Sequence, residues 1–532
     1  MNASPLLNKS FPIFLAIFIS AGFLAACGRE KTDPDDQDTE KTEKESGKND
    51  ESKLENLKKG KAAYKAKDYE TAAKHLKAAA EMGSTEAQYM FGLCLQEGKG
   101  VKKDHDEAVK WWRLAAEQDF PKAQFRLGSH YADTEKKEDE GETWYKKALP
   151  GLEKEAKKGD PEAQNMLGIC YEFGCGVKID LEEAVKWYRK AAEQGFDKAQ
   201  NNLAYRFYFG EGVEKDPVEA VRWWRIAAEQ GNTEAQVNLG LCYLNGDGIE
   251  KDPVETIRWW RMAAEQGSVD AQGRLGSRYY FGRDVEKDYA EAVKWWRMAA
   301  EQGDAGCQSN LGVCYYEGRG VEKDYAEAIK WYRKAAEQGD ADSQTNLANC
   351  YYNGFGVEKD LAEAVKWFRR NAEQGNAGAQ HNLATCYLNG EGVEMDLAEA
   401  IKWYRKAAEQ GLPQSQYEMG RFYHNGEGVE KDPAEAVNWW RKAAEQDFAW
   451  AQVDLGTSYE NGDGVEKDYY EAVKWYRKAA AQGDPSGQLK LAVCYALGYG
   501  VRENKLEAIN WARKAAAQGS EGARKLLEIL DD

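Results

Sequence analysis

Residues 235–270 read AQVNLGLCYLNGDGIEKDPVETIRWWRMAAEQGSVD, and variants of this stretch return along most of the chain. Its Trp259 has counterparts at a constant spacing of 36 residues. A fixed period between about 20 and 50 residues indicates a solenoid or another tandem array. The counterparts are Trp187, Trp223, Trp295, Trp331, Trp367, Trp403, Trp439, Trp475 and Trp511. The chain therefore repeats one structural unit over most of its length.

The second half of the repeat predicts a helix, which we call helix B. Asp252 is a favourable N-cap, Pro253 suits the first helical position, and Glu255 completes a capping box. Gly267 is expected to end the helix, because glycine adopts the left-handed conformation without strain. The residues that fall on one arc of this helix are Thr256, Ile257, Trp260, Ala263 and Ala264.

The first half of the repeat predicts helix A, residues 235–243, followed by a turn at 245–248. Gly240 is expected to let another backbone approach closely, and Ile249 to fill the space between the two helices. A single helical pair would be only marginally stable, so successive pairs must stack. The residues predicted on the apolar face of helix A are Ala235, Leu239, Cys242 and Tyr243.

The repeat predicts an all-α protein, an α/α solenoid of about twelve copies over residues 87–522. One step, from 123 to 163, is 40 residues long, and there the usual turn is replaced by residues 132–141. We expect this break to change the local curvature, or to be a binding insert. The copies begin at residues 87, 123, 163, 199, 235, 271, 307, 343, 379, 415, 451 and 487.

Both ends of the array carry predicted caps. Residues 54–86 read as two amphipathic helices that resemble a tetratricopeptide unit, and residues 523–532 supply a C-terminal capping helix. Atypical terminal repeats are expected, since a solenoid must cover its two ends.

The N-terminal residues 1–26 predict a secretory signal peptide. Lys9 supplies the positive charge, and the apolar run from Phe11 to Phe23 is short for a permanent span. The run ends in Leu-Ala-Ala-Cys at 24–27, which resembles a bacterial lipobox and implies lipidation of Cys27; an ordinary signal peptide is the alternative. Gly28 after the cysteine favours the outer membrane by the enterobacterial sorting rule. Residues 27–53 contain no aromatic residue and predict a disordered charged tether.

The composition and net charge limit the classes of partner that the protein can bind. The 532 residues carry a formal net charge of −18, with acids and bases interleaved in every copy. This pattern is typical of a solvated surface. Nucleic-acid binding is disfavoured, because it requires a basic footprint.

The repeated pattern Ala-Gln-x-x-Leu-Gly-x-x-Tyr-x-x-Gly-x-Gly-Val-x-x-Asp, then Ala-x-x-Trp-Tyr/Trp-x-x-Ala-Ala-x-x-Gly, resembles the Sel-one-like repeat, a relative of the tetratricopeptide repeat. The resemblance covers roughly residues 87–522. It implies a right-handed superhelix that acts as an adaptor or scaffold. Bacterial relatives include envelope lipoproteins that organise secretion or signalling complexes. Some cysteine-rich relatives are described as β-lactamases, which keeps an enzyme among the alternatives.

The residues give little support to catalysis. We find no Ser-x-x-Lys, no Gly-x-Ser-x-Gly and no His-Glu-x-x-His, so neither a cofactor nor a metal is predicted. The cysteine-rich relatives pair two cysteines within each repeat, whereas this chain usually has one; only Cys170–Cys175 is a local candidate for a disulfide. Seven cysteines share one helix A site and are expected to be small apolar fillers. They are Cys94, Cys170, Cys242, Cys314, Cys350, Cys386 and Cys494.

The fourth position of helix A, with the seventh and eleventh, predicts a polar stripe opposite the buried arc. Related arrays line their concave groove with helix A and hold extended peptides with Asn amides, which both donate and accept. A solvated polar residue is the alternative for the fourth position, and a helix stop for the eleventh. The five fourth-position amides are Asn202, Asn238, Asn310, Asn346 and Asn382.

Trp450 stands apart, because the other tryptophans occupy helix B sites. It is either an exposed interface anchor or packed on the neighbouring turn. Together these features predict a non-catalytic lipoprotein of the bacterial envelope, periplasm-facing, that binds a protein or peptide partner and meets the membrane only through its lipid. The alternatives are a cell-wall-active or β-lactamase-like hydrolase, and a peptidoglycan or glycan binder that uses Tyr208, Tyr280, Tyr316 and Tyr352.

Overall fold

The computed structural model describes the backbone of residues 38–531 and the side chains of residues 50–530. The predicted signal peptide, Cys27 and the first part of the predicted tether lie outside the described residues. Within residues 38–531 every regular element is a helix, as the 36-residue period predicts. None of these helices is long and apolar enough to cross a lipid bilayer.

The chain divides into two compact units, residues 1–263 and 264–532, and each is described by itself. The boundary falls in the last turn of α12 (Pro253–Glu265). Unit 1 contains α1 (Asp38–Lys65), α2 (Tyr69–Glu81), α3 (Thr85–Glu97), α4 (His105–Ala116), α5 (Pro121–Ser129), the π-helix η1 (His130–Thr134), α6 (Glu138–Lys157), α7 (Pro161–Phe173), α8 (Leu181–Glu193), α9 (Asp197–Phe209), α10 (Pro217–Glu229), α11 (Thr233–Asn245) and most of α12.

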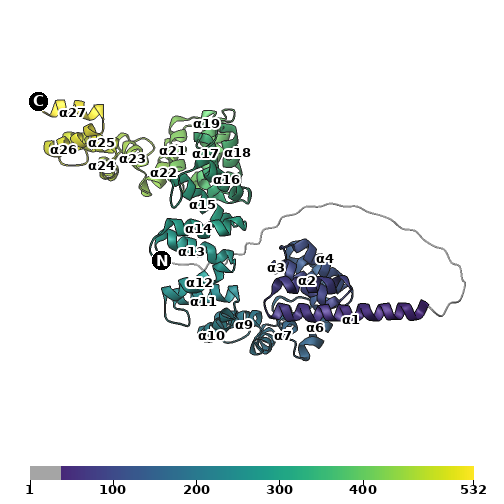
Figure 1. The fold of residues 1–532 in the computed structure, drawn as a ribbon. Helices are drawn as coiled ribbons and strands as arrows, with labels where there is room; N and C mark the ends of the chain where they lie inside the picture. Colours follow the sequence, from purple (N-terminus) through teal and green to yellow (C-terminus); the bar gives the residue numbers. More distant parts are fainter. Residues whose placement is uncertain (1–37, 532) are drawn as a thin grey trace. The chain divides into compact units, whose positions relative to one another are not determined.

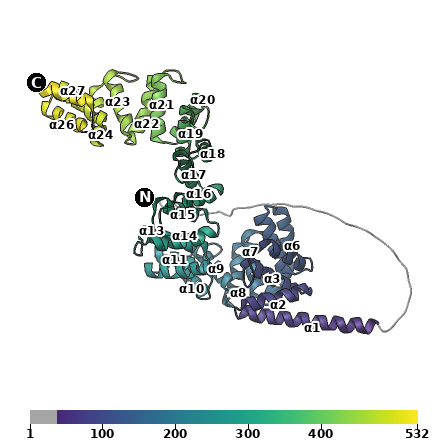
Figure 2. The ribbon, with the colours of Figure 1, turned by 45° about the horizontal axis from the view of Figure 1, so that its top comes forward.

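Unit 2 continues the same alternation of short helices (Figures 1 and 2). It contains α13 (Val269–Phe281), α14 (Tyr289–Glu301), α15 (Ala305–Glu317), α16 (Tyr325–Glu337), α17 (Ala341–Asn353), α18 (Leu361–Glu373), α19 (Ala377–Asn389), α20 (Leu397–Glu409), α21 (Pro413–Asn425), α22 (Pro433–Glu445), α23 (Ala449–Asn461), α24 (Tyr469–Ala481), α25 (Pro485–Leu497), α26 (Lys505–Ala517) and α27 (Glu521–Asp531).

From α3 onward, the odd-numbered helices are helix A and the even-numbered helices are helix B. Within each unit, helix A packs on the helix B that follows it and on the helix B before it, as α9 does on α10 and α8 and α15 does on α16 and α14. Helix A of one repeat also contacts helix A of the next, as α15 does with α17 and α23 with α25. Within each unit these helices therefore stack as an α-solenoid, with helix A of successive repeats side by side.

The predicted N-cap forms at Asp252, and Gly267, with φ of +93°, follows the last turn of α12 as expected, whereas the Glu255 side chain bonds to Arg258 and does not complete a capping box. The Asp252 carboxylate accepts the backbone N–H groups of Val254 and Glu255 at 2.9 and 3.1 Å, which starts α12. Gly246, with φ of +82°, ends α11. Gly248 has a different role, because a Cβ atom there would lie 2.2 Å from the carbonyl oxygen of Pro217. Gly248 thus lets the turn lie directly on the start of α10.

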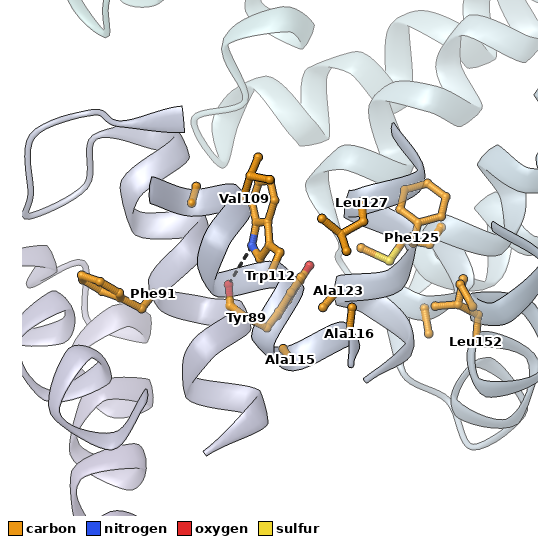
Figure 3. Close-up of a cluster of buried hydrophobic side chains, with 14 of the residues drawn as sticks. Tyr89, Phe91, Val109, Trp112, Ala115, Ala116, Ala123, Phe125, Leu127 and Leu152 are labelled. Atoms are coloured by element: carbon orange, nitrogen blue, oxygen red, sulfur yellow. Dashed lines mark hydrogen bonds between the residues drawn. The ribbon is translucent and has the colours of Figure 1, made fainter. Parts of the chain in front are cut away.

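In most repeats the core contains a glycine of helix A against an aromatic ring of helix B; alanine replaces the glycine at Ala204, Ala348, Ala384 and Ala492. A Cβ atom on Gly92 would lie 2.3 Å from Nε1 of Trp112, whose indole donates to the Tyr89 carbonyl at 3.2 Å (Figure 3). Gly240 faces Trp260 in the same way, at 2.4 Å from Nε1. The backbone of α12 also comes close, since the same Cβ atom would lie 3.3 Å from the carbonyl oxygen of Thr256, so Gly240 admits both an indole ring and a neighbouring backbone.

A ladder of buried glutamines joins neighbouring helices. The Gln308 side chain donates to the carbonyl of Ala300 on α14 at 3.0 Å, and its oxygen accepts from Gln338, after α16, at 2.8 Å. The ladder is interrupted in the α17–α18 repeat, where Asn371 replaces the usual alanine and donates to the Ala341 carbonyl at 2.7 Å. The side-chain oxygens of Ser343, Gln344 and Asn371 are buried there without a partner.

The 40-residue step from 123 to 163 differs from the other repeats in its helices. The missing turn becomes η1, directly after α5, and the added residues lengthen helix B to the 20 residues of α6. Gly151 lets this longer helix pass Pro121, since a Cβ atom would lie 2.6 Å from the proline Cβ. Helix A of the first repeat then reaches helices two and three repeats further on. Tyr89 donates to Glu162 at 2.6 Å, and Lys198 lies 3.4 Å from Glu97.

The N-terminal capping pair begins earlier than predicted. α1 starts at Asp38, so residues 38–53 are helical where composition predicts a disordered tether. Composition reports how little apolar surface a segment can bury, but a charged helix can also be supported by its own ion pairs. Lys53 lies 2.9 Å from Asp50 and Lys59 lies 2.7 Å from Glu55 along α1. In Figure 1 the N-terminal part of α1 runs beyond the helices on which it packs.

Two glycines of α15 test the packing of glycine on an aromatic ring. We expect Gly312→Ala to lower the free energy of unfolding by about 1–3 kcal/mol, because its Cβ atom would lie 2.5 Å from Cδ1 of the buried Tyr332. Urea denaturation followed by circular dichroism measures the change. Gly306→Ala on the same helix meets no atom closer than 3.5 Å and is the matched control, expected to be neutral or slightly stabilising. Equal effects of the two substitutions would contradict this account of the core.

Candidate partner-binding surface

The five predicted asparagines occupy the fourth position of helix A on α9, α11, α15, α17 and α19, and each is half-buried. We call this row of fourth positions the amide stripe. It lies on the side where helix A of one repeat approaches helix A of the next, so an amide there can bond either to the neighbouring helix or to a partner. The structure distinguishes these two uses.

In unit 1 the stripe amides bond to the neighbouring helix. The Asn202 side chain donates to Asn165 on α7 at 3.0 Å. The Asn238 side chain donates to the hydroxyl of Tyr205 on α9 at 3.0 Å. These two amides hold successive helices A together, so they are poorly placed to bind a partner.

In unit 2 the stripe amides are free. Among the described residues, the side chains of Asn310, Asn346 and Asn382 have no hydrogen-bond partner. The difference between the units follows from the residue 37 positions earlier in the sequence. That residue lies on the preceding helix A and would have to supply the hydrogen-bond partner. Asn165 and Asn201 stand there in unit 1, whereas those positions in unit 2 are Gly273, Ser309 and Thr345. Three consecutive repeats therefore present an amide that donates and accepts without competition from the fold.

The first repeats of unit 1 use the same face for internal bracing. Tyr89 and Glu97 of α3 contact Glu162 and Lys198, as described above, and Lys122 of α5 lies 2.9 Å from Asp160. Burial raises the pKa of Tyr89 well above its usual value, so the phenol stays protonated and remains a donor. This part of the helix A face is occupied by polar contacts of the chain itself.

The asparagines at the eleventh position of helix A act as helix stops, which is the alternative given above for this position. Asn245, Asn353 and Asn425 bond to Asp247, to the Asn349 carbonyl and to Glu427, all within four residues. These amides serve the helix end. Sequence reasoning missed that three copies carry an exposed phenylalanine at this position, although the residues are visible in the printed chain. These are Phe173, Phe209 and Phe281.

Trp450 is both exposed and packed. The side chain is 59% exposed, and its ring lies 5.6 Å from Phe448 and 5.9 Å from Tyr417, centroid to centroid. The ring of Tyr417 lies 5.5 Å from that of Phe448. The two alternatives for Trp450 therefore combine: one side of the indole rests on two aromatic rings and the other side meets solvent. We call Tyr417, Phe448 and Trp450 the aromatic shelf.

Tyr417 also lines a pocket of about 260 Å³ between α21 and α23, which we call the α21–α23 pocket. Its wall includes Arg421, His424, Asp454 and Asp463, with the buried Trp440 behind them. The His424 ring lies 5.3 Å from the Trp440 ring, centroid to centroid. Asp454 occupies the fourth position of its helix A, so the pocket continues the amide stripe into two repeats where the amide is replaced by an acid.

Four tyrosines proposed as exposed glycan platforms are not exposed. Tyr208, Tyr280, Tyr316 and Tyr352 are all half-buried. Tyr208 donates to Asp247 at 2.7 Å and Tyr352 donates to Glu391 at 2.6 Å, so each hydroxyl is held by the turn of the next repeat. The expectation was wrong because it placed these rings by sequence position without the turn that covers them.

The cysteines have the properties of core residues. All nine within the described residues are free thiols, and Cys170 and Cys175 form no disulfide. Burial raises the pKa of Cys94 to about 11 and that of Cys242 to about 12. Such thiols stay protonated at neutral pH and make poor nucleophiles. Within the part of the chain that the structure describes, no group of three His, Cys, Asp or Glu residues is placed to hold a metal.

The fold and its repeated core define an α-solenoid repeat protein. A family model described as the Sel1 repeat matches thirteen segments, and the chain belongs to this family, as the Sel-one-like pattern predicts. The first match lies within the predicted capping pair, which is therefore part of the same series. The matched residues are 58–84, 85–120, 121–149, 161–196, 197–232, 233–268, 269–304, 305–340, 341–376, 377–412, 413–448, 451–484 and 485–520.

Two solved structures support the assignment. The protein c5321, described as a protective antigen of uropathogenic Escherichia coli with an SLR fold, is 34% identical with a TM-score of 0.63; the match covers 86% of this chain and 90% of that one. A Sel1 repeat protein from Oxalobacter formigenes is 34% identical with a TM-score of 0.50, over 59% of this chain and 94% of that one. A search of curated proteins found no match. Sel1 repeat proteins are generally scaffolds that bind other proteins, and they are typically non-catalytic.

Two histidines that lie 25 residues apart in the sequence meet at the register break. Nε2 of His105, at the start of α4, lies 3.2 Å from Nδ1 of His130. The other ring nitrogen of His130 lies 3.3 Å from Glu135. Burial and the neighbouring His105 lower the pKa of His130, against the opposing effect of Glu135. The spacing in sequence gave no sign of this pair, because π-helix η1 brings His130 to the site.

The histidine pair predicts a loss of stability in acid. An unfolded histidine has a pKa near about 6.5. Because the folded pKa of His130 is lower, the unfolded state binds more protons as the pH falls below that value, and the free energy of unfolding decreases. We expect the urea midpoint to fall from pH 7.5 to pH 5.5, and to fall less in His130→Cys, which carries the residue found at this site in seven other copies. His381, whose pKa burial also lowers, contributes in both proteins. Equal falls would show that His130 is not involved.

Proposed function

We propose that this protein is a non-catalytic scaffold of the bacterial cell envelope, and that it binds an extended segment of a partner protein along the amide stripe of α15, α17 and α19. The observation that carries the proposal is the set of three free, half-buried amides, Asn310, Asn346 and Asn382, at equivalent positions of consecutive repeats. The generally protein-binding character of the Sel1 repeat family supports the class of function.

The chemistry of the stripe favours a peptide main chain. Each amide offers two N–H donors and a carbonyl acceptor, which matches the alternating N–H and C=O groups of an extended segment. An amide carries no net charge, so it binds a main chain without selecting for side-chain charge. Half-burial raises the value of each hydrogen bond, since a group left unpaired at such a site loses much of its contact with water.

We place the protein at the envelope on the N-terminal residues, which lie outside the described residues. Lys9, the apolar run from Phe11 to Phe23 and the Leu-Ala-Ala-Cys sequence at 24–27 occur in the order of a lipoprotein signal. Cys27 is then the lipidated residue, and the solenoid faces the periplasm from the outer membrane. The lipid is the only part of the protein that enters the membrane in this proposal.

The scaffold is tested by capture. Purified full chain, immobilised and incubated with an envelope extract, is expected to retain one or a few proteins through a high-salt wash, because hydrogen bonds to amides do not depend on net charge. The Asn310→Ala, Asn346→Ala, Asn382→Ala triple variant is expected to lose them while keeping its helical spectrum. Asn202→Ala, Asn238→Ala is the matched control: its amides bond inside the fold, so it loses some stability and keeps capture. Unchanged capture by the triple variant would overturn the role of the stripe.

The lipid anchor has a separate test. After secretion, the full chain is expected in the detergent-soluble membrane fraction, and Cys27→Ala is expected in the soluble periplasmic fraction, since no helix in residues 38–531 could hold it in a bilayer. Fractionation followed by immunoblotting measures the distribution. Membrane retention of Cys27→Ala would contradict lipidation at this residue.

A further inference from the structure

The aromatic shelf is an unusual surface for this chain. At the position of Trp450, equivalent helices A carry a small or charged residue, such as Glu234 on α11, Asp270 on α13 and Asp342 on α17. More than half of the Trp450 side chain meets solvent, although Phe448 and Tyr417 support its inner side. Exposed tryptophan on a firm aromatic base is the residue type that dominates protein interfaces. The shelf therefore offers an apolar contact for a partner.

The adjoining α21–α23 pocket has the size and lining of a side-chain site. Its volume of about 260 Å³ is below the range of about 300–1,000 Å³ that is common for small-molecule sites. Tyr417 belongs to both the shelf and the pocket wall, so the two features are continuous. One residue of a bound segment can enter the pocket while a neighbouring residue lies on Trp450.

The charges of the pocket decide what enters it. Arg421 is paired with Glu418, Nη1 to Oε2 at 3.0 Å, and Nδ1 of His424 lies 3.4 Å from Asp463. Asp454 is different: among the described residues, no cationic nitrogen lies within 4.0 Å of its carboxylate. The pocket thus holds a half-buried carboxylate that the charges of Arg421 and His424 reach, but that has no ion-pair partner within 4.0 Å. A cationic group from a partner would complete it, and the formal net charge of −18 attracts such a partner.

The pKa shifts of two acids near the pocket agree with a missing cation. Burial raises the pKa of Asp454, and hydrogen bonding from Tyr417 with the charges of His424 and Arg421 lowers it only in part. Burial also raises the pKa of Glu418 despite its contact with Arg421. Both acids would be stabilised in their charged form by one more cation. Of the two cationic side chains, arginine suits the wall better, because its planar guanidinium stacks on aromatic rings and binds a carboxylate with two parallel hydrogen bonds.

We propose that the α21–α23 pocket binds an arginine side chain of an extended protein segment, and that the aromatic shelf holds an apolar side chain two residues away. This inference rests on the proposed scaffold function and adds the residue that it recognises. The amide stripe then holds the main chain of the partner segment over α15, α17 and α19. The pocket selects the segment by charge in the next two repeats, where the fourth position of helix A is acidic, at Glu418 and Asp454.

Two heptapeptides test the proposal, acetyl-Gly-Gly-Arg-Gly-Phe-Gly-Gly-amide and its reverse order acetyl-Gly-Gly-Phe-Gly-Arg-Gly-Gly-amide. Calorimetric titration into the full chain is expected to show saturable binding at one site for at least one of them. Replacing arginine by the neutral isostere citrulline is expected to weaken binding about tenfold or more, because the charge-assisted hydrogen bonds to Asp454 are lost. If neither peptide binds, or if citrulline binds as well as arginine, the proposal is overturned.

Variants locate the binding. Asp454→Asn keeps the shape of the side chain and is expected to weaken the arginine peptide about tenfold, whereas Trp450→Ser is expected to weaken it about fivefold. Asp342→Asn, an exposed acid of α17 outside the pocket, is the matched control and is expected to leave binding unchanged. Peptide binding that survives Asp454→Asn would overturn the assignment of the pocket. If the unaltered full chain captures no envelope protein but binds the arginine peptide, the scaffold is overturned and the pocket stands.

Discussion

The contact between a helix A glycine and a helix B aromatic ring is the constraint on which this structure depends. The glycine lies so close to the ring that a methyl group would not fit between them. The pairs are Gly92 with Trp112, Gly240 with Trp260, and Gly312 with Tyr332. The ring then reaches across the pair, and in Trp112 and Trp260 its N–H bonds to a helix A carbonyl. In the repeats that have this glycine, the contact limits how closely the two helices of the pair approach.

Polar contacts decide what the repeats do beyond stacking. In most repeats the buried glutamine of helix A bonds to the helix B before it and to the glutamine after the helix B that follows it, as Gln308 does, so these amides serve the fold. The amide stripe uses one side-chain type in two ways: Asn202 and Asn238 bond within unit 1, whereas Asn310, Asn346 and Asn382 remain free in unit 2. Function in a repeat protein of this kind therefore resides in departures from the repeat. Trp450 and Asp454 are two further departures, and both lie on α23.

Much of the fold could be predicted from the sequence, because a 36-residue period, an Asp-Pro start and a glycine stop are local signals. Helices, caps and buried arcs needed no knowledge of distant residues. The candidate site was harder to predict from the sequence. Whether Asn310 is free depends on Gly273, 37 positions earlier, and the pocket depends on Tyr417, Asp454 and Asp463 meeting across two helices. α1 begins at Asp38, within the segment whose composition predicts a disordered tether.

The interrupted glutamine ladder has a mechanical consequence. Stability in a solenoid is approximately a sum over repeats and their interfaces, so opening begins where that sum is smallest. The α17–α18 repeat buries oxygens of Ser343, Gln344 and Asn371 without partners, and each such atom costs about 1–3 kcal/mol. Asn371 offsets part of this cost through its bonds to α17. Under tension this repeat would be the first in unit 2 to yield, and it carries Asn346, the middle amide of the stripe. In the proposed scaffold, a pulling force would then release the partner segment at its centre before the ends of the array come apart.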